Sequence, residues 1–385
     1  MNKKVIALAV AGALALPLAA KAQTANVTMY GTFRAVLDST DVEGVGRNNQ
    51  VNSWSSRWGI RGTEALGGGL NGIFQLETGI QVDKPGGVNI NTTASGGNIT
   101  SVANSNNAIV IREAWVGLNG GFGTIKMGAG LTPYDDILGM SHLLLANGYE
   151  GQTTLGGGTN TSITRSGNFT NFGALGAGGV CNNSTNYDAR YGDGIRYDSP
   201  DFAGLTVATH FAFLGENSTG YKCKGWDSKV QYGNGPIEAG IAYSRHIDFV
   251  NYDGNAWRLH AGYNAGVVKV LGSYERMSYD GNNGSTGSAK ARYYNVGVVV
   301  PIGPGWLTAQ YHNRDKGVTV SSTAIAEVTN GGGKAYSMSY KYGFSKRTFA
   351  YTWAARVVAD SGASVEGGPK GNKATSLGFG LQHNF

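Results

Sequence analysis

The side chains most able to act on a solute are charged residues that recur inside short segments of alternating polarity. Arg57 and Arg61 lie in SSRWGIRG, and Arg112 lies in IVIREAWVGL. Fixed charges of this kind attract, repel and orient charged solutes. The sequence has no Gly-x-Ser-x-Gly, His-Glu-x-x-His or Cys-x-x-Cys motif, and its six histidines are scattered among different segments. This pattern favours electrostatic selection of solutes, with an enzyme built from isolated Ser, His and Asp residues as a rival class.

The segments that carry these charges read as β-strands. In NVTMYGTFRAVLD, for example, Val27, Met29 and Phe33 fall on one face, while Thr28 and Tyr30 fall on the other. An alternation with a period of two residues is typical of a strand with two different faces. Counted along the chain, sixteen such segments occur, the last being ATSLGFGLQHNF.

The connections between these segments alternate in length. ALGGG, NGGF, DFAG, GNGP and PIGPG read as short turns, whereas the longer connections cover 39–52, 84–107, 131–190, 214–225, 248–256, 279–290, 315–334 and 359–373. Short turns at one end and long loops at the other are typical of an outer-membrane barrel. A closed barrel also satisfies every backbone polar group inside a membrane. We therefore predict an all-β fold, a 16-stranded antiparallel transmembrane β-barrel with short periplasmic turns and long extracellular loops.

One connection stands out, because 131–190 spans about sixty residues without a clear strand. Loops of this length inside compact proteins are uncommon and are usually functional or disordered. The segment opens with the turn signal Thr132-Pro133 and includes an apolar run, LLL, which suits packing against a wall. We predict that this third long loop folds into the barrel and narrows it. Its acids are Asp135, Asp136 and Glu150.

The N-terminus has the order of a secretory signal peptide: lysines, an apolar run and then small residues. Cleavage after Ala22 would leave 23–385 as a single barrel domain. Cleavage removes Lys3, Lys4 and Lys21 but no acid, which leaves 28 basic residues against 25 acidic ones. A net charge of +3 is too small for a nucleic-acid footprint, so no nucleic-acid partner is expected. An N-terminal anchor helix is the alternative reading of 1–22.

Alternation predicts which charges face the lumen. If Trp58 and Ile60 face lipid, Arg57 and Arg61 point inward. If Trp115 faces lipid, Arg112 and Val116 point inward. The predicted inward bases are Arg57, Arg112, Arg61, Lys126, Arg34, Arg190 and Arg196. The predicted inward acids are Glu77 and Asp198 on the wall, with Asp135, Asp136 and Glu150 on the loop. The acidic side of the constriction, opposite the bases, is predicted to comprise Asp135, Asp136, Glu150 and Glu77. Lipid-facing Arg or Lys at the membrane midplane costs roughly 2–4 kcal/mol, so inward placement is favoured.

Glu113 is an exception to this pattern, because the same alternation places its carboxylate on the outer face. Two explanations remain open. Glu113 lies at a subunit contact or near the membrane interface, or a bulge in the strand turns it inward.

Two further features bear on assembly. Cys181 and Cys223 lie in loop-like sequence of an exported chain, so a disulfide is plausible, with two free thiols as the alternative. The last strand alternates apolar residues outward and the chain ends on Phe385, which resembles the assembly signal of outer-membrane barrels.

Several blocks spread over the mature chain resemble the general bacterial porins, specifically the trimeric sixteen-stranded porins of β-proteobacteria. They are VTMYGTFRAV, SSRWGIRGTEALGGGLNGIFQLETGI, REAWVGLNGGFGTIKMG, IRYDSPDFAGL, GFSKRTFAY and GLQHNF. The resemblance implies a homotrimer of water-filled pores, each narrowed by its third outside loop. By motif, Arg57 and Arg112 match the family's basic cluster on the barrel wall.

The sequence thus predicts a general diffusion porin of a Gram-negative outer membrane that passes ions and small hydrophilic solutes, with a mild anion preference. It predicts contact with outer-membrane lipid, including lipopolysaccharide, and neither a cofactor nor a metal. The alternatives are a substrate-specific outer-membrane channel and a surface adhesin or structural barrel.

Overall fold

The computed structural model describes residues 26–83, 92–95, 98–101, 109–141, 154–156, 160–162, 187, 190–213, 223–249, 252–281, 288–315, 332–365 and 368–385. The predicted signal peptide, 1–22, lies outside these residues. Among the described residues, no helix is long and apolar enough to span a membrane.

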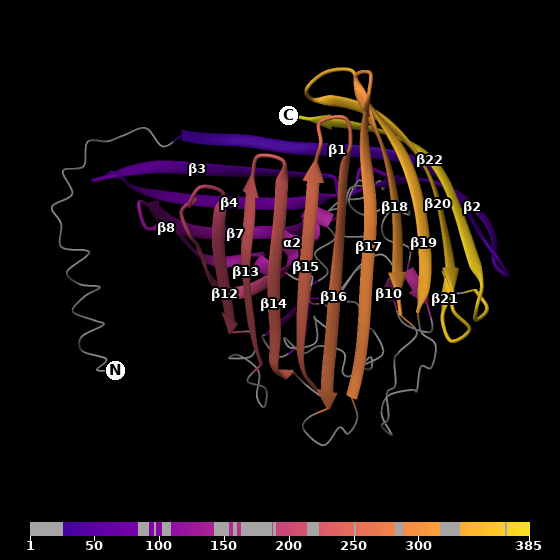
Figure 1. The fold of residues 1–385 in the computed structure, drawn as a ribbon. Helices are drawn as coiled ribbons and strands as arrows, with labels where there is room; N and C mark the ends of the chain where they lie inside the picture. Colours follow the sequence, from indigo (N-terminus) through magenta and orange to yellow (C-terminus); the bar gives the residue numbers. More distant parts are fainter. Residues whose placement is uncertain are drawn as a thin grey trace.

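A single antiparallel sheet closes on itself to form a barrel (Figure 1). Its strands are β1 (Asn26–Val42), β2 (Gly46–Ser53), β3 (Arg57–Gly67), β4 (Leu70–Ile80), β7 (Ile109–Gly120), β8 (Gly123–Leu131), β11 (Arg190–Asp198), β12 (Leu205–Phe213), β13 (Lys224–Asn234), β14 (Ile237–Phe249), β15 (Tyr252–Asn264), β16 (Lys269–Gly281), β17 (Ser288–Ile302), β18 (Gly305–Arg314), β19 (Gly333–Gly343), β20 (Thr348–Ala359) and β22 (Lys373–Asn384). Both β2 and β3 pair with β1, so they are two halves of one barrel strand. The barrel therefore has sixteen strands in the described part of the chain, as predicted.

The ring closes where the first strand meets the last. β1 and β22 pair from Thr32↔Asn384 to Val42↔Ala374 without a break in register. Their outer faces carry apolar rows, and Leu377, Phe379 and Leu381 are each about half exposed. Because side chains alternate between faces, every neighbour of these residues points into the barrel. The apolar rows thus face lipid, which confirms the predicted alternation for these residues.

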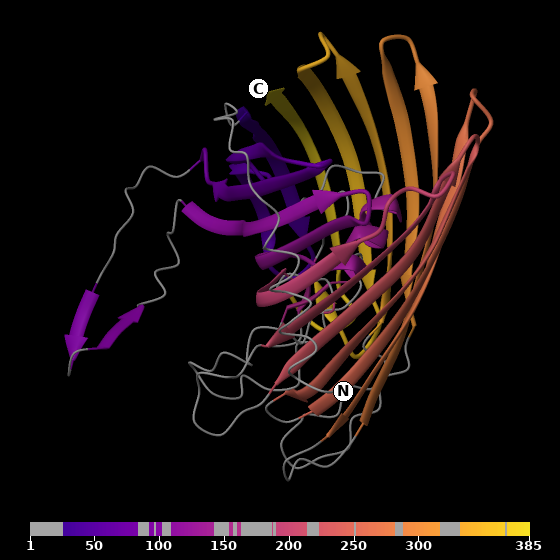
Figure 2. The ribbon, with the colours of Figure 1, turned by 90° about the vertical axis from the view of Figure 1, so that its left-hand side faces the viewer.

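Smaller elements lie outside the wall sheet. They are β5 (Thr92–Ser95), β6 (Asn98–Ser101), α2 (Pro133–Ser141), β9 (Thr154–Gly156), β10 (Asn160–Ser162) and β21 (Ser364–Val365). β5 and β6 form a hairpin that projects beyond the barrel wall (Figure 2). β9 pairs with both β10 and β21, so the long segment after β8 is joined to the last long connection.

Two connections that the sequence presents as loops are largely strand. In 39–52, β1 continues to Val42 and β2 begins at Gly46, and in 248–256, β14 ends at Phe249 and β15 begins at Tyr252. The reason is that hydrogen bonding between strands continues past the membrane, whereas apolar alternation stops at its boundary. About 9–11 residues suffice to cross the bilayer, and β1 has 17.

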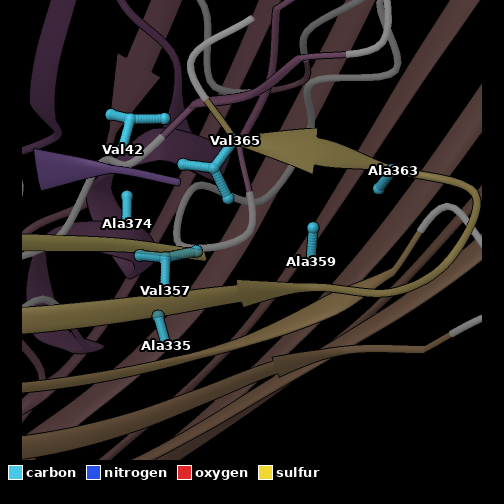
Figure 3. Packing of buried hydrophobic residues seen from close by; sticks show 7 residues of the cluster. All are labelled: Val42, Ala335, Val357, Ala359, Ala363, Val365 and Ala374. Atoms are coloured by element: carbon cyan, nitrogen blue, oxygen red, sulfur yellow. The ribbon is translucent and has the colours of Figure 1, made fainter. Parts of the chain in front are cut away.

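An apolar cluster covers the inner wall near the ends of β1, β19, β20 and β22 (Figure 3). Val42, Ala335, Val357 and Ala374 form one row across these four strands. Val365 of β21 packs with them and is fully buried. The last long connection therefore folds inward against the wall at this end.

Candidate pore constriction

The helix α2 begins directly after β8 and lies inside the barrel against β12–β16 (Figure 1). Thr132 caps its N-terminus, since its hydroxyl and carbonyl accept hydrogen bonds from the backbone N–H of Asp135 at 3.3 and 3.1 Å. Pro133 occupies the first helical position, where its missing N–H costs nothing. The sequence therefore starts a helix at the root of the long loop, a helix that strand alternation did not predict.

A buried polar cluster fixes α2 to the opposite wall. The Tyr134 hydroxyl donates to Glu275, and Arg258 donates to the Tyr134 carbonyl at 2.9 Å and to Glu275 at 3.1 Å. The guanidinium of Arg258 also lies 4.2 Å from the centre of the Tyr134 ring. All three residues are at most 1% exposed. Breaking a buried pair of this kind is strongly destabilising, so α2 is held firmly against the wall.

Asp136 extends from α2 to the adjacent wall strands. Its carboxylate forms ion pairs with Arg196 at 2.6 Å and Lys229 at 2.7 Å. Arg196 also pairs with Asp198 at 2.6 Å, and Lys126 pairs with Asp198 at 3.1 Å. Asp136, which the sequence places on the acidic side of the constriction, is thus bound directly to bases of the wall. The charges of Asp136 and Arg196 largely cancel each other, and such a pair attracts charged solutes less than an unpaired charge does.

A cavity of about 170 Å³ lies beside this network, between α2 and strands β7, β8, β11 and β12. Its lining combines acids, bases and aromatic rings: Glu113, Trp115, Lys126, Asp136, Arg196 and His210. The space beside the loop is therefore polar.

The basic residues of β3 and β7 gather around one carboxylate, that of Glu77 on β4. Glu77 accepts a hydrogen bond from Arg112 at 2.8 Å and lies 3.6 Å from Arg57. Tyr30 donates to Glu77 at 3.1 Å, and the Arg61 guanidinium lies 5.1 Å from the Tyr30 ring centre. We call Arg57, Arg61 and Arg112 the basic wall. Glu77 faces the lumen as predicted, but it lies within the basic wall and not on the acidic side opposite.

A β-bulge decides the placement of Arg112 and Glu113. Where β4 pairs with β7, Glu77 lies opposite Glu113, and the next residue of β4, Thr78, lies opposite Ile111. Arg112 of β7 has no partner on β4 and is therefore the inserted residue. Glu113 therefore shares a face with Glu77, and it accepts hydrogen bonds from Gln75 at 2.8 Å and Trp115 at 3.1 Å. The bulge explanation for Glu113 is thus correct.

The bulge also corrects the prediction for Trp115. Its ring faces the interior, 5.0 Å from the Lys126 ammonium, while Val116 on the other face is 64% exposed. Strict alternation put both side chains on the wrong faces, because it allowed no inserted residue. Arg112 points inward only through the bulge.

The other predicted bases lie at different depths. Arg34 is 9% exposed and donates to Gln382 at 3.2 Å, so it is built into the wall. Arg190, at the start of β11, is exposed and within electrostatic range of Arg112, Asp135 and Glu113. Asp135 is half-buried in the first turn of α2.

The remaining predicted positions concern the loop and the ends of the chain. Glu150 and Cys181 lie outside the described residues. Cys223 is 1% exposed and disulfide-bonded. Phe385 exchanges two backbone hydrogen bonds with Gly31, both at 3.1 Å, and its ring centre lies 5.2 Å from that of Phe33.

Sequence reasoning missed the residues that hold α2. Lys229, Arg258 and Glu275 all point inward from β13, β15 and β16. Alternation could have identified Lys229 and Arg258. Trp226 and Trp257 on the same strands are exposed on the outer face, and residues an odd number of positions away from them point inward. No sequence signal indicated that α2 would contact them.

Comparisons with known proteins agree with this architecture. A family model described as Gram-negative porin matches residues 7–385. The major outer membrane protein P.IB of Neisseria gonorrhoeae is 27% identical, and the outer membrane porin protein 32 of Delftia acidovorans is 28% identical, each over the full length of both chains. Among solved structures, an anion-selective porin from Comamonas acidovorans superimposes with a TM-score of 0.67 at 23% identity, covering 94% of this chain and 100% of that one. A closed sixteen-stranded barrel with a charged interior and a match over nearly the whole chain lead to one conclusion: this protein belongs to the Gram-negative porin family of the outer membrane.

Proposed function

We propose that the chain forms a water-filled channel for passive diffusion of ions and small hydrophilic solutes, with a mild preference for anions. The basic wall is the observation that carries this proposal. Around the lumen beside α2, six bases face four acids; the bases are Arg57, Arg61, Arg112, Lys126, Arg196 and Lys229, and the acids are Glu77, Glu113, Asp136 and Asp198. An excess of two positive charges favours anions modestly.

The positive excess is shared between the two sides of the lumen. On the α2 side, Asp136 and Asp198 are each paired with two bases. On the basic wall, Glu77 pairs with Arg57 and Arg112, while Arg61 lies over the Tyr30 ring. Glu113 accepts hydrogen bonds from the neutral donors Gln75 and Trp115. Each side therefore keeps an excess of one positive charge, three bases against two acids. Segment 131–190, whose helix α2 narrows the lumen, is the proposed constriction loop.

Porins are channels and not enzymes, and nothing in this proposal requires a bound cofactor.

We propose further that residues 1–22 are cleaved as a signal peptide, that 23–385 form the mature barrel domain, and that three copies associate. One solved relative, OmpT of Vibrio cholerae, is described in a trimer form. Migration on a native gel as a detergent-resistant, heat-sensitive trimer would support this assembly, and a monomer by sedimentation would contradict it.

The outer face suits contact with anionic outer-membrane lipid, including lipopolysaccharide. Tyr294, Tyr311 and Tyr336 form a row on adjacent strands, with the centres of successive, mutually tilted rings 6.0 and 5.2 Å apart. Beyond this row, toward the longer connections, stand exposed bases: Arg245, Arg276, Arg292, Lys334 and Arg356. Aromatic rings favour the membrane interface, and guanidinium groups bind phosphate in a bidentate manner. This arrangement matches a phosphorylated lipid headgroup.

Conductance in a planar bilayer under a KCl gradient tests the channel proposal. We expect discrete current steps, in groups of three, with a reversal potential on the anion side. The double variant Arg57→Gln/Arg112→Gln should shift that potential toward cations. Unchanged selectivity would remove the basic wall from the constriction, and folded protein without steps would overturn the channel.

A further inference from the structure

A buried polar site lies on the inner wall where the first and last strands meet. Three side chains on β1 and β22 form it: Asp38, Thr40 and Ser376, which are 1%, 3% and 1% exposed. Thr40 and Ser376 are directly opposite each other, and Asp38 is two residues from Thr40 on the same face. Directly opposite side chains on one face have Cβ atoms about 4.5–5.5 Å apart. The three side chains are therefore neighbours.

Apolar clusters enclose the site above and below. On one side lies the row that contains Val42 and Ala374, covered by Val365 (Figure 3). On the other side, the Trp54 and Trp353 rings lie with their centres 4.4 Å apart, tilted by 45°, and pack with Tyr351. The ring of Trp353 lies over Gly378, which is the partner of Asp38 on β22. The three polar side chains are thus shielded from the aqueous lumen.

The oxygens at this site are not fully satisfied. Asp38 accepts a hydrogen bond from Asn52 at 2.5 Å through one carboxylate oxygen, and Gln50 also stabilises the carboxylate. Its other oxygen and the hydroxyls of Thr40 and Ser376 have no hydrogen-bond partner. Among the described residues, no base pairs with Asp38; the nearby Arg47 instead pairs with the exposed Asp41 at 3.5 Å.

Such an arrangement is energetically unfavourable by itself. Buried charges in proteins are paired or coordinate metal ions, and a buried polar atom without a partner costs about 1–3 kcal/mol. Three unsatisfied oxygens on adjacent positions therefore point to a shared partner that is positively charged. Carboxylate and hydroxyl oxygens are the ligands that hard cations prefer.

We propose that Asp38, Thr40 and Ser376 bind a small hard cation, Na⁺ or Ca²⁺, at the β1–β22 seam. The cation neutralises the single buried carboxylate and links the first strand to the last, which are the two strands whose pairing closes the barrel. This site is separate from the basic wall and does not depend on the proposed ion selectivity.

Terbium luminescence tests binding directly, because Tb³⁺ takes the same ligands as Ca²⁺ and is excited by a nearby tryptophan. Purified trimer titrated with Tb³⁺ should show sensitised emission that Ca²⁺ competes away. Asp38→Asn removes the only anionic ligand with little change of shape and should weaken Tb³⁺ binding about tenfold or more. The matched control is Asp41→Asn, on the same strand but the opposite face, which should leave the emission unchanged.

Thermal unfolding of the same variants shows whether a metal cation or a proton neutralises Asp38, and whether Na⁺ or Ca²⁺ binds better. At constant ionic strength and pH, the unfolding temperature should be higher in NaCl or CaCl₂ than in choline chloride, whose cation is too large for the site. This difference should vanish in Asp38→Asn and persist in Asp41→Asn. An unfolding temperature that follows pH but not the identity of the cation would show that Asp38 is protonated and would overturn the proposal, as would Tb³⁺ emission that Asp38→Asn leaves intact.

Discussion

Glu77 accepts a hydrogen bond from the Nε of Arg112 at 2.8 Å, and the same carboxylate lies 3.6 Å from the Nε of Arg57. One acid on β4 thereby connects arginines from the strands on either side of it. The carboxylate orients both guanidiniums and also lowers the positive potential that they project into the lumen. Its removal should therefore change selectivity in a known direction.

Glu77→Gln is expected to strengthen the anion preference of the channel. A unit charge 4 Å from an ion is worth roughly 1 kcal/mol in water, so the anion permeability should rise and the cation permeability should fall, each by about fivefold at most. The change should shrink as salt concentration rises, because ions screen the charge. Reversal potentials in KCl gradients measure the ratio of the two permeabilities. A ratio that moves toward cations would contradict the placement of Glu77 in the basic wall.

Glu113→Gln should act in the same direction as Glu77→Gln, because the bulge at Arg112 turns this carboxylate into the lumen. Glu64 provides the matched control, since it is exposed on the outer face of β3, two strands away from β7. Glu64→Gln should leave the reversal potential as it is. If Glu113→Gln and Glu64→Gln shifted the reversal potential equally, ion selectivity would depend on the total charge of the protein and not on the position of a carboxylate in the lumen.

Gly240→Val should reduce the single-channel conductance by pushing α2 toward the pore axis. A Cβ on Gly240 would lie 2.5 Å from the Cδ1 of Ile137, a fully buried residue of α2. Overpacking of this kind typically costs 1–3 kcal/mol or moves the backbone. Step sizes in planar bilayers give the conductance.

The control for this substitution is Gly233→Val on the adjacent β13. A Cβ there meets nothing within 4 Å, so the conductance should not change. An unaltered conductance in Gly240→Val as well would show that α2 does not border the narrowest part of the pore.

Gly31→Val should impair barrel closure. A Cβ at Gly31 would lie 2.3 Å from the Cζ of Phe385, whose backbone pairs with Gly31 on both sides. The terminal residue could then not dock on β1, and we expect a lower unfolding temperature and a smaller folded fraction. Heat-modifiable gel mobility measures both. The control is Gly121→Val, where a side chain meets nothing within 4 Å, and a wild-type profile for Gly31→Val would show that this docking contributes little.

Alternation in the sequence was sufficient to predict the barrel, its strand number and the inward direction of Arg57, Arg61 and Glu77. These properties are local, because a strand between water and lipid must separate its polar and apolar residues at every second position. The same rule failed at Trp115 and Val116, since a single inserted residue reverses the faces beyond it. Nothing local in REAWVG marks that insertion.

The contacts of the long segment after β8 were decided only by the tertiary structure. The sequence placed Asp136 in a loop that enters the barrel, but its partners Arg196 and Lys229 come from strands that follow much later in the chain. Likewise, Tyr134 meets Arg258 and Glu275 only because the sheet closes. The period of a strand determines which face a side chain occupies. The period carries no information about which distant residue that side chain will contact, and therefore none about which charges remain unpaired in the pore.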